Sequence, residues 1–97
     1  MEEEYLEIDT SKIKEESRIY IKVATLEGYK DLENVMNEIR AGKVLVLRIG
    51  EIKRKKEAEL KKFIDKIKKF IENLEGDIIG VGDDLLILTP RSAKIER

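Results

Sequence analysis

The chain has 97 residues and 41% of them are apolar, enough for one modest hydrophobic core and therefore for one domain. Charged residues make up 42%, yet the formal net charge is only −1, which predicts an ion-paired surface rather than a polyanion or polycation. The absence of Cys and His removes disulfides, thiolate chemistry, the usual zinc ligands and the commonest general acid and base. We therefore expect no enzyme activity, no cofactor and no metal.

Residues 1–17 form an acidic segment, with seven acidic side chains against two basic ones. This composition predicts an N-terminal arm or linker, followed by one α/β core domain over residues 18–97. No stretch has the roughly 18 to 20 consecutive apolar residues that span a bilayer, and the acidic start is unlike a signal peptide. We expect a cytoplasmic protein, and the high Lys and Glu content is typical of thermophiles.

The first half of the core domain predicts a strand, a helix and a second strand. Residues 18–23 alternate between polar and β-branched side chains, which predicts a half-buried strand. Apolar residues at 32, 35, 36 and 39 have helical spacing, and Gly42 lies where a helix ends. Residues 44–47 are apolar at every position, which is typical of a central strand covered on both faces.

The second half predicts one long helix and a hairpin. An apolar stripe runs through residues 53–75, and Gly76 closes this helix. Two apolar strands, 77–81 and 85–89, flank a turn at residues 82–84 and predict an antiparallel hairpin. Residues 92–96 could add a short edge strand.

The order β-α-β-α-β-β predicts a two-layer α/β sandwich with two helices on one face of a four- to five-stranded mixed sheet. Right-handed crossovers that step in the same direction place both helices on the same face. Apolar side chains that point the other way then need a partner, and a second copy of the chain is the simplest one. We expect a dimer through the other face of the sheet.

Several motifs have weaker functional interpretations. Gly80 and Gly82 lie within and after a strand instead of opening a helix, so a phosphate loop is disfavoured. Asp77, Asp83 and Asp84 lack calcium-loop spacing and are interpreted as turn residues. Nine basic residues against five acidic ones over 53–75 leave a nucleic-acid-binding module open as the alternative function, and a small-molecule regulatory domain as a third.

The hairpin gives the sequence its most specific resemblance. A helix ending in Phe70-Ile71 is followed by Gly76, then by Ile78-Ile79-Gly80-Val81-Gly82 and by Asp84-Leu85-Leu86-Ile87-Leu88-Thr89-Pro90, with Ile95 after it. From about residue 18 to 95 this order resembles the core of the SepF family, and the archaeal SepF-like proteins above all. That family joins the tubulin-like FtsZ ring to the cell membrane.

The resemblance implies a cell division adaptor at the division site that dimerises, can polymerise and binds the C-terminal tail of FtsZ. It implies an assembly interface that includes Gly76, Ile78 and Gly80. It also implies a peptide-binding site with apolar anchors and basic residues, namely Leu86, Leu88, Lys66 and Lys69. Family members usually begin with an amphipathic membrane-targeting helix, and the acidic residues 1–17 do not resemble one. Membrane contact would therefore need a segment not evident here, and no nucleic-acid partner is expected.

Overall fold

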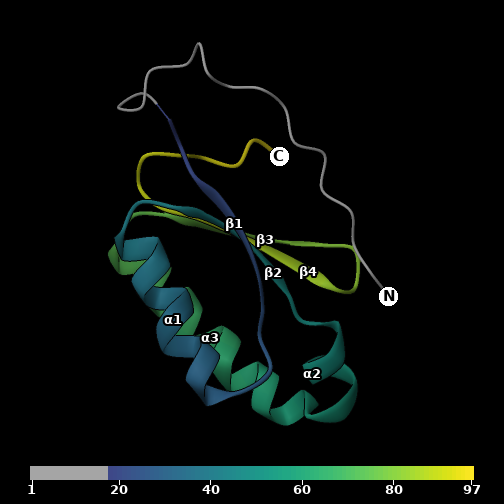
Figure 1. Ribbon diagram of the computed structural model, residues 1–97. Helices are drawn as coiled ribbons and strands as arrows, with labels where there is room; N and C mark the ends of the chain where they lie inside the picture. The colour runs from purple at the N-terminus through teal and green to yellow at the C-terminus, as the bar shows by residue number, and fades with distance from the viewer. Residues whose placement is uncertain (1–17) are drawn as a thin grey trace.

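A computed structural model describes residues 18–97 as a four-stranded sheet with three helices (Figure 1). The predicted arm, residues 1–17, lies outside the described residues. The strands are β1 (Ile21–Thr25), β2 (Val44–Arg48), β3 (Asp77–Val81) and β4 (Leu85–Thr89). The helices are α1 (Tyr29–Arg40), α2 (Gly50–Lys55) and α3 (Glu57–Asn73).

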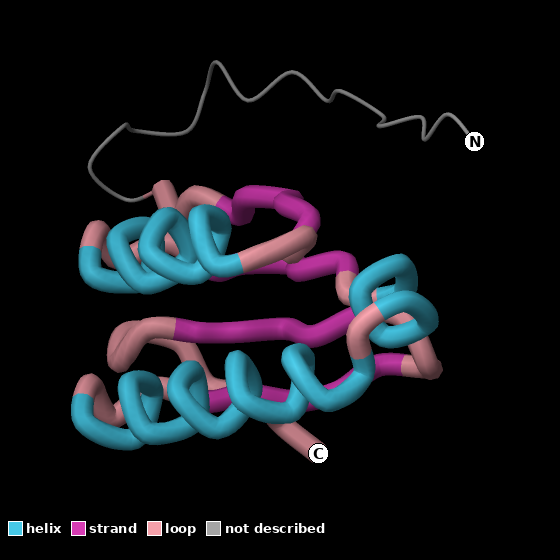
Figure 2. Tube along the Cα trace, turned by 90° about the horizontal axis from the view of Figure 1, so that it is seen from below, coloured by secondary structure: helices cyan, strands magenta, loops and turns pink. Residues whose placement is uncertain are grey.

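The sheet is mixed and has the strand order β1-β2-β4-β3. β1 and β2 run parallel, whereas β4 is antiparallel to both β2 and β3. Both crossovers step in the same direction across the sheet, so α1 and α3 lie side by side on one face (Figure 2). The predicted α/β sandwich, the interior position of β2 and the hairpin are confirmed, but residues 92–96 form no strand.

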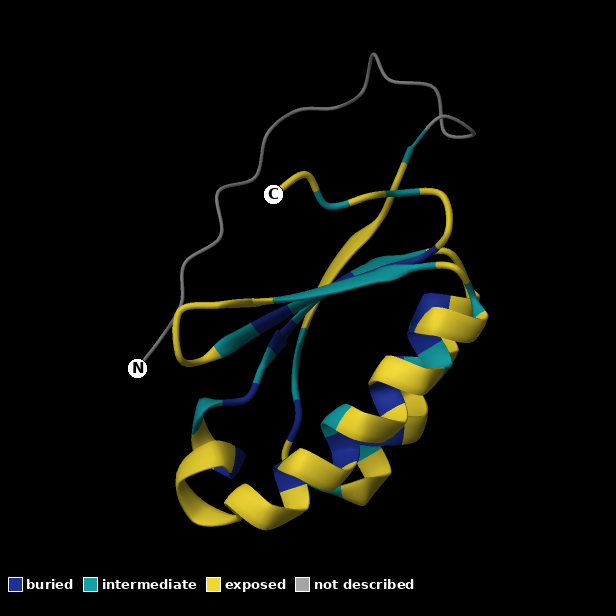
Figure 3. Ribbon diagram, turned by 180° about the vertical axis from the view of Figure 1, so that it is seen from behind, coloured by how far each residue is buried: buried dark blue, intermediate teal, exposed yellow. Residues whose placement is uncertain are grey.

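The hydrophobic core lies between the two helices and the sheet. β2 and β4 bury alternate leucines, and α1 and α3 bury the apolar positions that recur at helical spacing (Figure 3). The fully buried large side chains are Leu26, Ile39, Leu45, Leu47, Ile67, Ile71 and Leu88. The sheet thus packs one face against the helices, and its other face has no described helix over it.

The single long helix predicted over residues 53–75 is wrong, because the chain breaks it at Lys56. Lys56 has φ −144° and ψ 57°, values far from helical, and it separates α2 from α3. The basic run at residues 53–56 has no apolar position, so the stripe of α3 cannot continue through it. The break allows α2 to begin at Gly50 and to bury Ile52 in the core.

The first strand differs from its prediction in position, and the structure shows which of its two faces meets the helices. It spans Ile21–Thr25 instead of residues 18–23, and its β-branched side chains point away from the helices. Ile21 is 66% exposed and Val23 is 38% exposed, whereas Ala24 packs against the core. β1 is an edge strand, and its alternation marks the uncovered face of the sheet instead of the core.

The end of α3 depends on Glu75 rather than on a left-handed glycine. Glu75 has φ 59°, whereas Gly76 is not among the residues with positive φ. Glu75 and Gly76 donate backbone hydrogen bonds to the carbonyls of Glu72 and Ile71, which satisfies the last turn. The left-handed conformation costs a residue with a Cβ about 1–2 kcal/mol.

We expect Glu75→Gly to stabilise the protein by about 1 kcal/mol, because glycine adopts the left-handed region without this cost. Thermal unfolding followed by circular dichroism measures the change. Glu75→Ala is the matched control, since it also removes the exposed ion pair with Arg91 (3.1 Å) but keeps the strained conformation. A Glu75→Gly protein that melts at or below the temperature of Glu75→Ala contradicts the assignment.

Candidate functional site

The uncovered side of the sheet, the open face, is an apolar surface that none of the three described helices covers. Its side chains alternate with the buried leucines of β2 and β4 and therefore point away from α1 and α3. The open face consists of Ile21, Val23, Thr25, Val44, Val46, Arg48, Ile79, Val81, Leu85 and Ile87. Nearly all of these residues are apolar, and a hydrophobic surface of this kind marks an interaction site.

The strand register places these side chains in continuous rows. One row crosses all four strands and is apolar throughout: Val23, Val46, Ile87 and Ile79. In the next row, Leu85 and Val81 are apolar, whereas Thr25 and Arg48 are polar. The residues of the central strands are only half-buried, and Val81 at the far edge is 43% exposed.

The C-terminal segment after β4 lies on the open-face side of the sheet and borders it (Figure 1). Asp77 holds this segment in place. Its carboxylate accepts hydrogen bonds from the backbone N–H of Ile95 (3.3 Å) and from Arg97 Nη2 (3.0 Å), and Arg97 also donates to the carbonyl of Ile78 (2.9 Å). One end of the open face is therefore closed by the chain itself.

We expect acid to release this segment. Burial raises the pKa of Asp77, but the hydrogen bonds from Ile78 N–H, Arg97 and Ile95 N–H outweigh it, and the net pKa is lowered from 3.8. The contribution to stability is thus fully present above pH 3.8 and is lost as the pH falls through the lower folded-state pKa. Amide hydrogen exchange at Ile95 measures the release.

Asp77→Asn is the matched variant for this prediction, because it keeps an acceptor oxygen but has no titratable charge. Exchange at Ile95 should then be faster than in the wild type at neutral pH and insensitive to pH below about 4, once the intrinsic exchange rate is corrected. Equal protection of Ile95 in both proteins at every pH would show that the carboxylate does not hold the segment.

The three residues predicted for assembly do not lie on the open face. Ile78 and Gly80 alternate with Ile79 and Val81 on β3 and point to the helix side. Ile78 packs against the core, and Gly80 is exposed at the sheet edge. A Cβ on Gly76 would clash with the carbonyl oxygen of Thr89. The contribution of these three residues to assembly stays a prediction. Gly76 also has a structural role, because the fold leaves no room for a Cβ at this position.

The four residues predicted for peptide binding lie in two different environments. Leu88 is fully buried and Leu86 is 8% exposed, and both lie beneath the helices. Lys66 and Lys69 are exposed on α3, where Lys66 Nζ lies 5.3 Å from the ring centroid of Tyr29 on α1. The leucines can support a peptide site only from within the core, whereas the lysines are accessible to a partner.

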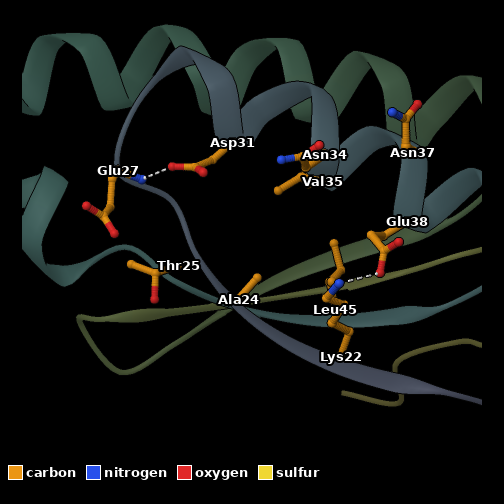
Figure 4. A pocket seen from close by; sticks show the side chains of 10 residues that line it. All are labelled: Lys22, Ala24, Thr25, Glu27, Asp31, Asn34, Val35, Asn37, Glu38 and Leu45. Atoms are coloured by element: carbon orange, nitrogen blue, oxygen red, sulfur yellow. Dashed lines mark hydrogen bonds and ion pairs between the residues drawn. The ribbon is translucent and has the colours of Figure 1, made fainter.

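A polar groove between β1 and α1 is a feature that the sequence patterns did not indicate (Figure 4). Its volume is about 670 Å³, and its charged lining consists of Lys22, Glu27, Asp31 and Glu38. Glu38 lies within 3.1 Å of both Lys43 Nζ and Lys22 Nζ, and hydrogen bonds from Lys43 and then Lys22 lower the pKa of Glu38. Asp31 accepts hydrogen bonds from the backbone N–H groups of Glu27 and Gly28.

Two other kinds of site are absent from residues 18–97. No group of three or more His, Cys, Asp or Glu side chains within residues 18–97 could hold a metal ion. Over the same residues, no helix is long and apolar enough to cross a membrane.

The fold and its site define a class of protein: a small two-layer α/β sandwich in which one face of the sheet stays uncovered and apolar. A family model described as "Cell division protein SepF" matches residues 21–95 of this chain. The chain therefore belongs to the SepF family of cell division proteins. The resemblance seen in the hairpin is confirmed.

Solved structures agree with this family. A SepF-like protein from Archaeoglobus fulgidus has a TM-score of 0.77 and 32% identity, with 81% of this chain and 94% of that chain covered. A SepF-like protein from Pyrococcus furiosus has a TM-score of 0.72 and 26% identity, with 82% and 96% covered. SepF from Methanobrevibacter smithii, solved in complex with FtsZ-CTD, shares the fold at a TM-score of 0.72 and 17% identity, with 80% and 98% covered.

A curated relative extends the likeness to nearly the whole chain. An uncharacterised protein of Methanocaldococcus jannaschii is 28% identical over 95 residues, which cover 98% of this chain and 63% of the relative. The chain thus spans less than two thirds of the length of the curated relative it matches. The relatives are archaeal, as the resemblance implied.

Proposed function

We propose that the chain is a cell division adaptor that associates with itself through the open face and binds the C-terminal tail of FtsZ. The observation that carries the proposal is the apolar row across all four strands, on the face that none of the three described helices covers. An adaptor needs surfaces for other proteins rather than reactive side chains. The alternative, a nucleic-acid-binding module, is less favoured, because Lys55 on α2, Lys61 on α3 and Lys56 between the two helices pair with neighbouring carboxylates.

Self-association is supported by the free energy that is gained when the apolar open face is removed from water. Apolar surface removed from water contributes about 25 cal/mol per Å², so a flat apolar sheet face gains from stacking on a second copy. Two sheets stack face to face at a spacing of about 10 Å with interdigitated side chains. The two-fold dimer is the simplest arrangement, because each copy then contributes the same face.

Tail binding is supported by family membership and by the chemistry of α3. The related M. smithii protein was solved with FtsZ-CTD, and this chain shares its fold. Lys66 and Lys69 offer accessible ammonium groups that would attract an acidic peptide. The Lys66 side chain is also placed over Tyr29, an exposed aromatic ring that a peptide could contact.

The decisive test of tail binding is a titration of the protein with an archaeal FtsZ C-terminal peptide, in which calorimetry or fluorescence anisotropy measures binding. We expect binding at micromolar concentration, and an absence of binding at about 100 μM overturns the tail assignment. Reversal of two charges, Lys66→Glu with Lys69→Glu, should weaken binding by about tenfold or more. Lys61→Glu with Lys62→Glu is the matched control on the same helix, and it should leave the affinity within about threefold. A duplex oligonucleotide in the same assay tests the alternative function.

We expect Val46→Lys to reduce the size of the self-associated species, because it places an ammonium group at the centre of the apolar row. Analytical ultracentrifugation of wild type and variant at equal concentration measures the mass. Ala58→Lys, on the exposed surface of α3, adds the same charge away from the sheet and should leave the mass unchanged. A Val46→Lys protein of wild-type mass overturns the open face as an interface.

A further inference from the structure

The outer edge of β1 offers unpaired backbone groups to a further strand. The bonds from Val44 N–H to the Tyr20 carbonyl and from Leu26 N–H to the Arg48 carbonyl show that even-numbered residues of β1 pair with β2. The backbone groups of Ile21, Val23 and Thr25 must then point away from the sheet. None of these groups has a partner among residues 18–97. A row of free N–H and C=O groups is a template for pairing with another chain.

The two edges of the sheet differ in their protection against pairing with another strand, which indicates that the β1 edge is an interaction site. On β3, the C-terminal segment protects the edge, since Arg97 donates to the carbonyl of Ile78 and Asp77 holds Ile95. β1 has no proline, and its only charge, Lys22, is turned toward Glu38 on the helix side (3.1 Å). The side chains of Ile21 and Val23 are instead exposed and apolar. Within residues 18–97, the usual safeguards against edge pairing are thus present on β3 and missing on β1.

We propose that β1 pairs antiparallel with β1 of a second copy of this chain, so that two four-stranded sheets join into one of eight strands. Val23 is the middle residue of the strand Ile21–Thr25. A two-fold axis at Val23 pairs each Val23 with its counterpart and each Ile21 with Thr25, and all of these residues present outward backbone groups. A two-fold axis at Lys22 would set two ammonium groups opposite each other, which is unfavourable.

The groove beside β1 fits the side chains that this register brings to it (Figure 4). With Val23 on the axis, Lys22 of the second copy lies opposite Ala24, whose small side chain lines the groove. Three carboxylates, on Glu27, Asp31 and Glu38, face one ammonium group, on Lys22, among the charged lining residues. A second Lys22 would bring this lining closer to neutrality. Charge thus favours the same register that avoids the contact between the two lysines.

Edge pairing deepens the proposed self-association, which by itself gives only a dimer. Stacking of open faces and pairing of β1 edges are two different two-fold contacts on one molecule. When each copy uses both contacts, the two contacts alternate from one copy to the next. The assembly can then grow beyond a dimer. The pairing does not depend on the open face, and the two contacts can be removed one at a time.

The experiment measures the mass of the full chain by analytical ultracentrifugation after one or both contacts are removed. Val23→Pro removes an outward N–H group without affecting a bond to β2, a position where an edge strand tolerates proline. Val23→Thr is the matched control, because it changes the same side chain of the open face but keeps the N–H group, so an effect on the open face appears in both variants and an effect on the edge only in Val23→Pro. Val46→Lys removes the open-face contact. Thr25→Pro is a second edge variant in case Val23→Pro does not fold, and circular dichroism checks the folding of each protein.

We expect wild type and Val23→Thr to form species larger than a dimer, each single variant to form a dimer, and Val23→Pro with Val46→Lys to form a monomer. The edge contact is overturned if Val46→Lys alone is a monomer, or if neither proline variant changes the mass. A Val46→Lys protein of wild-type mass, with a smaller Val23→Pro protein, supports the edge contact and overturns the open-face one. The two failures are therefore distinguishable.

Discussion

Replacement of Gly76 by alanine is expected to lower the free energy of unfolding by about 3 kcal/mol or more. The added Cβ would clash with the carbonyl oxygen of Thr89 and would lie 3.4 Å from Cγ2 of Ile71. The oxygen belongs to the backbone of β4, so relief of the contact must shift the strand against α3 rather than rotate a side chain. Urea unfolding followed by circular dichroism measures the loss.

Gly28→Ala is the control for the Gly76 variant. A Cβ at Gly28 meets no atom within 4 Å, and its φ of −174° is open to any residue, so the change should stay within about 1 kcal/mol. The comparison also bears on assembly. If Gly76→Ala is as stable as Gly28→Ala but has a smaller mass in solution, Gly76 acts directly at an interface. If stability and mass fall together, the assembly defect follows from the displaced strand.

The arrangement of the sheet was predictable because hydrophobic periodicity and crossover handedness determine it. The continuously apolar run at residues 44–47 indicated an interior strand, and the turn at residues 82–84 indicated the hairpin. The break at Lys56 was missed because a basic run has no apolar positions by which to follow a helix. The sequence did not predict which face of β1 meets the helices, because alternation shows only that a strand has two different faces.

The candidate site was less predictable because long-range contacts decide its details. Topology alone indicated an uncovered sheet face, and the register then showed its apolar row. The contact of Gly76 with Thr89 joins residues 13 positions apart, and Asp77 holds Ile95 over 18 positions. The sequence shows a glycine and an aspartate at those places, but not which backbone atoms they approach. The resemblance predicted Leu86 and Leu88 as peptide anchors, but it did not show that both are buried.

Replacement of Leu88 by alanine is expected to destabilise the protein by about 3 kcal/mol. Leu88 is fully buried, and its neighbours across the sheet are Leu45 on β2 and Ile78 on β3. The loss includes the transfer of the missing methyl groups and the cavity they leave. Ile87→Ala is the matched control on the same strand, where a half-buried side chain of the open face should cost only about 1 kcal/mol. Urea unfolding measures both.

The Leu88→Ala variant also separates a role of Leu88 in the core from a role in direct contact with the FtsZ peptide. Because no described surface exposes this side chain, any loss of FtsZ-peptide binding in Leu88→Ala should follow the unfolded fraction and disappear on cooling to a temperature where the variant is folded. Leu88→Met, which nearly conserves volume, should recover stability and binding together. A fully folded Leu88→Ala protein that binds the peptide tenfold more weakly would require the core beneath α3 to open for the tail, and Leu88 would then contact it directly.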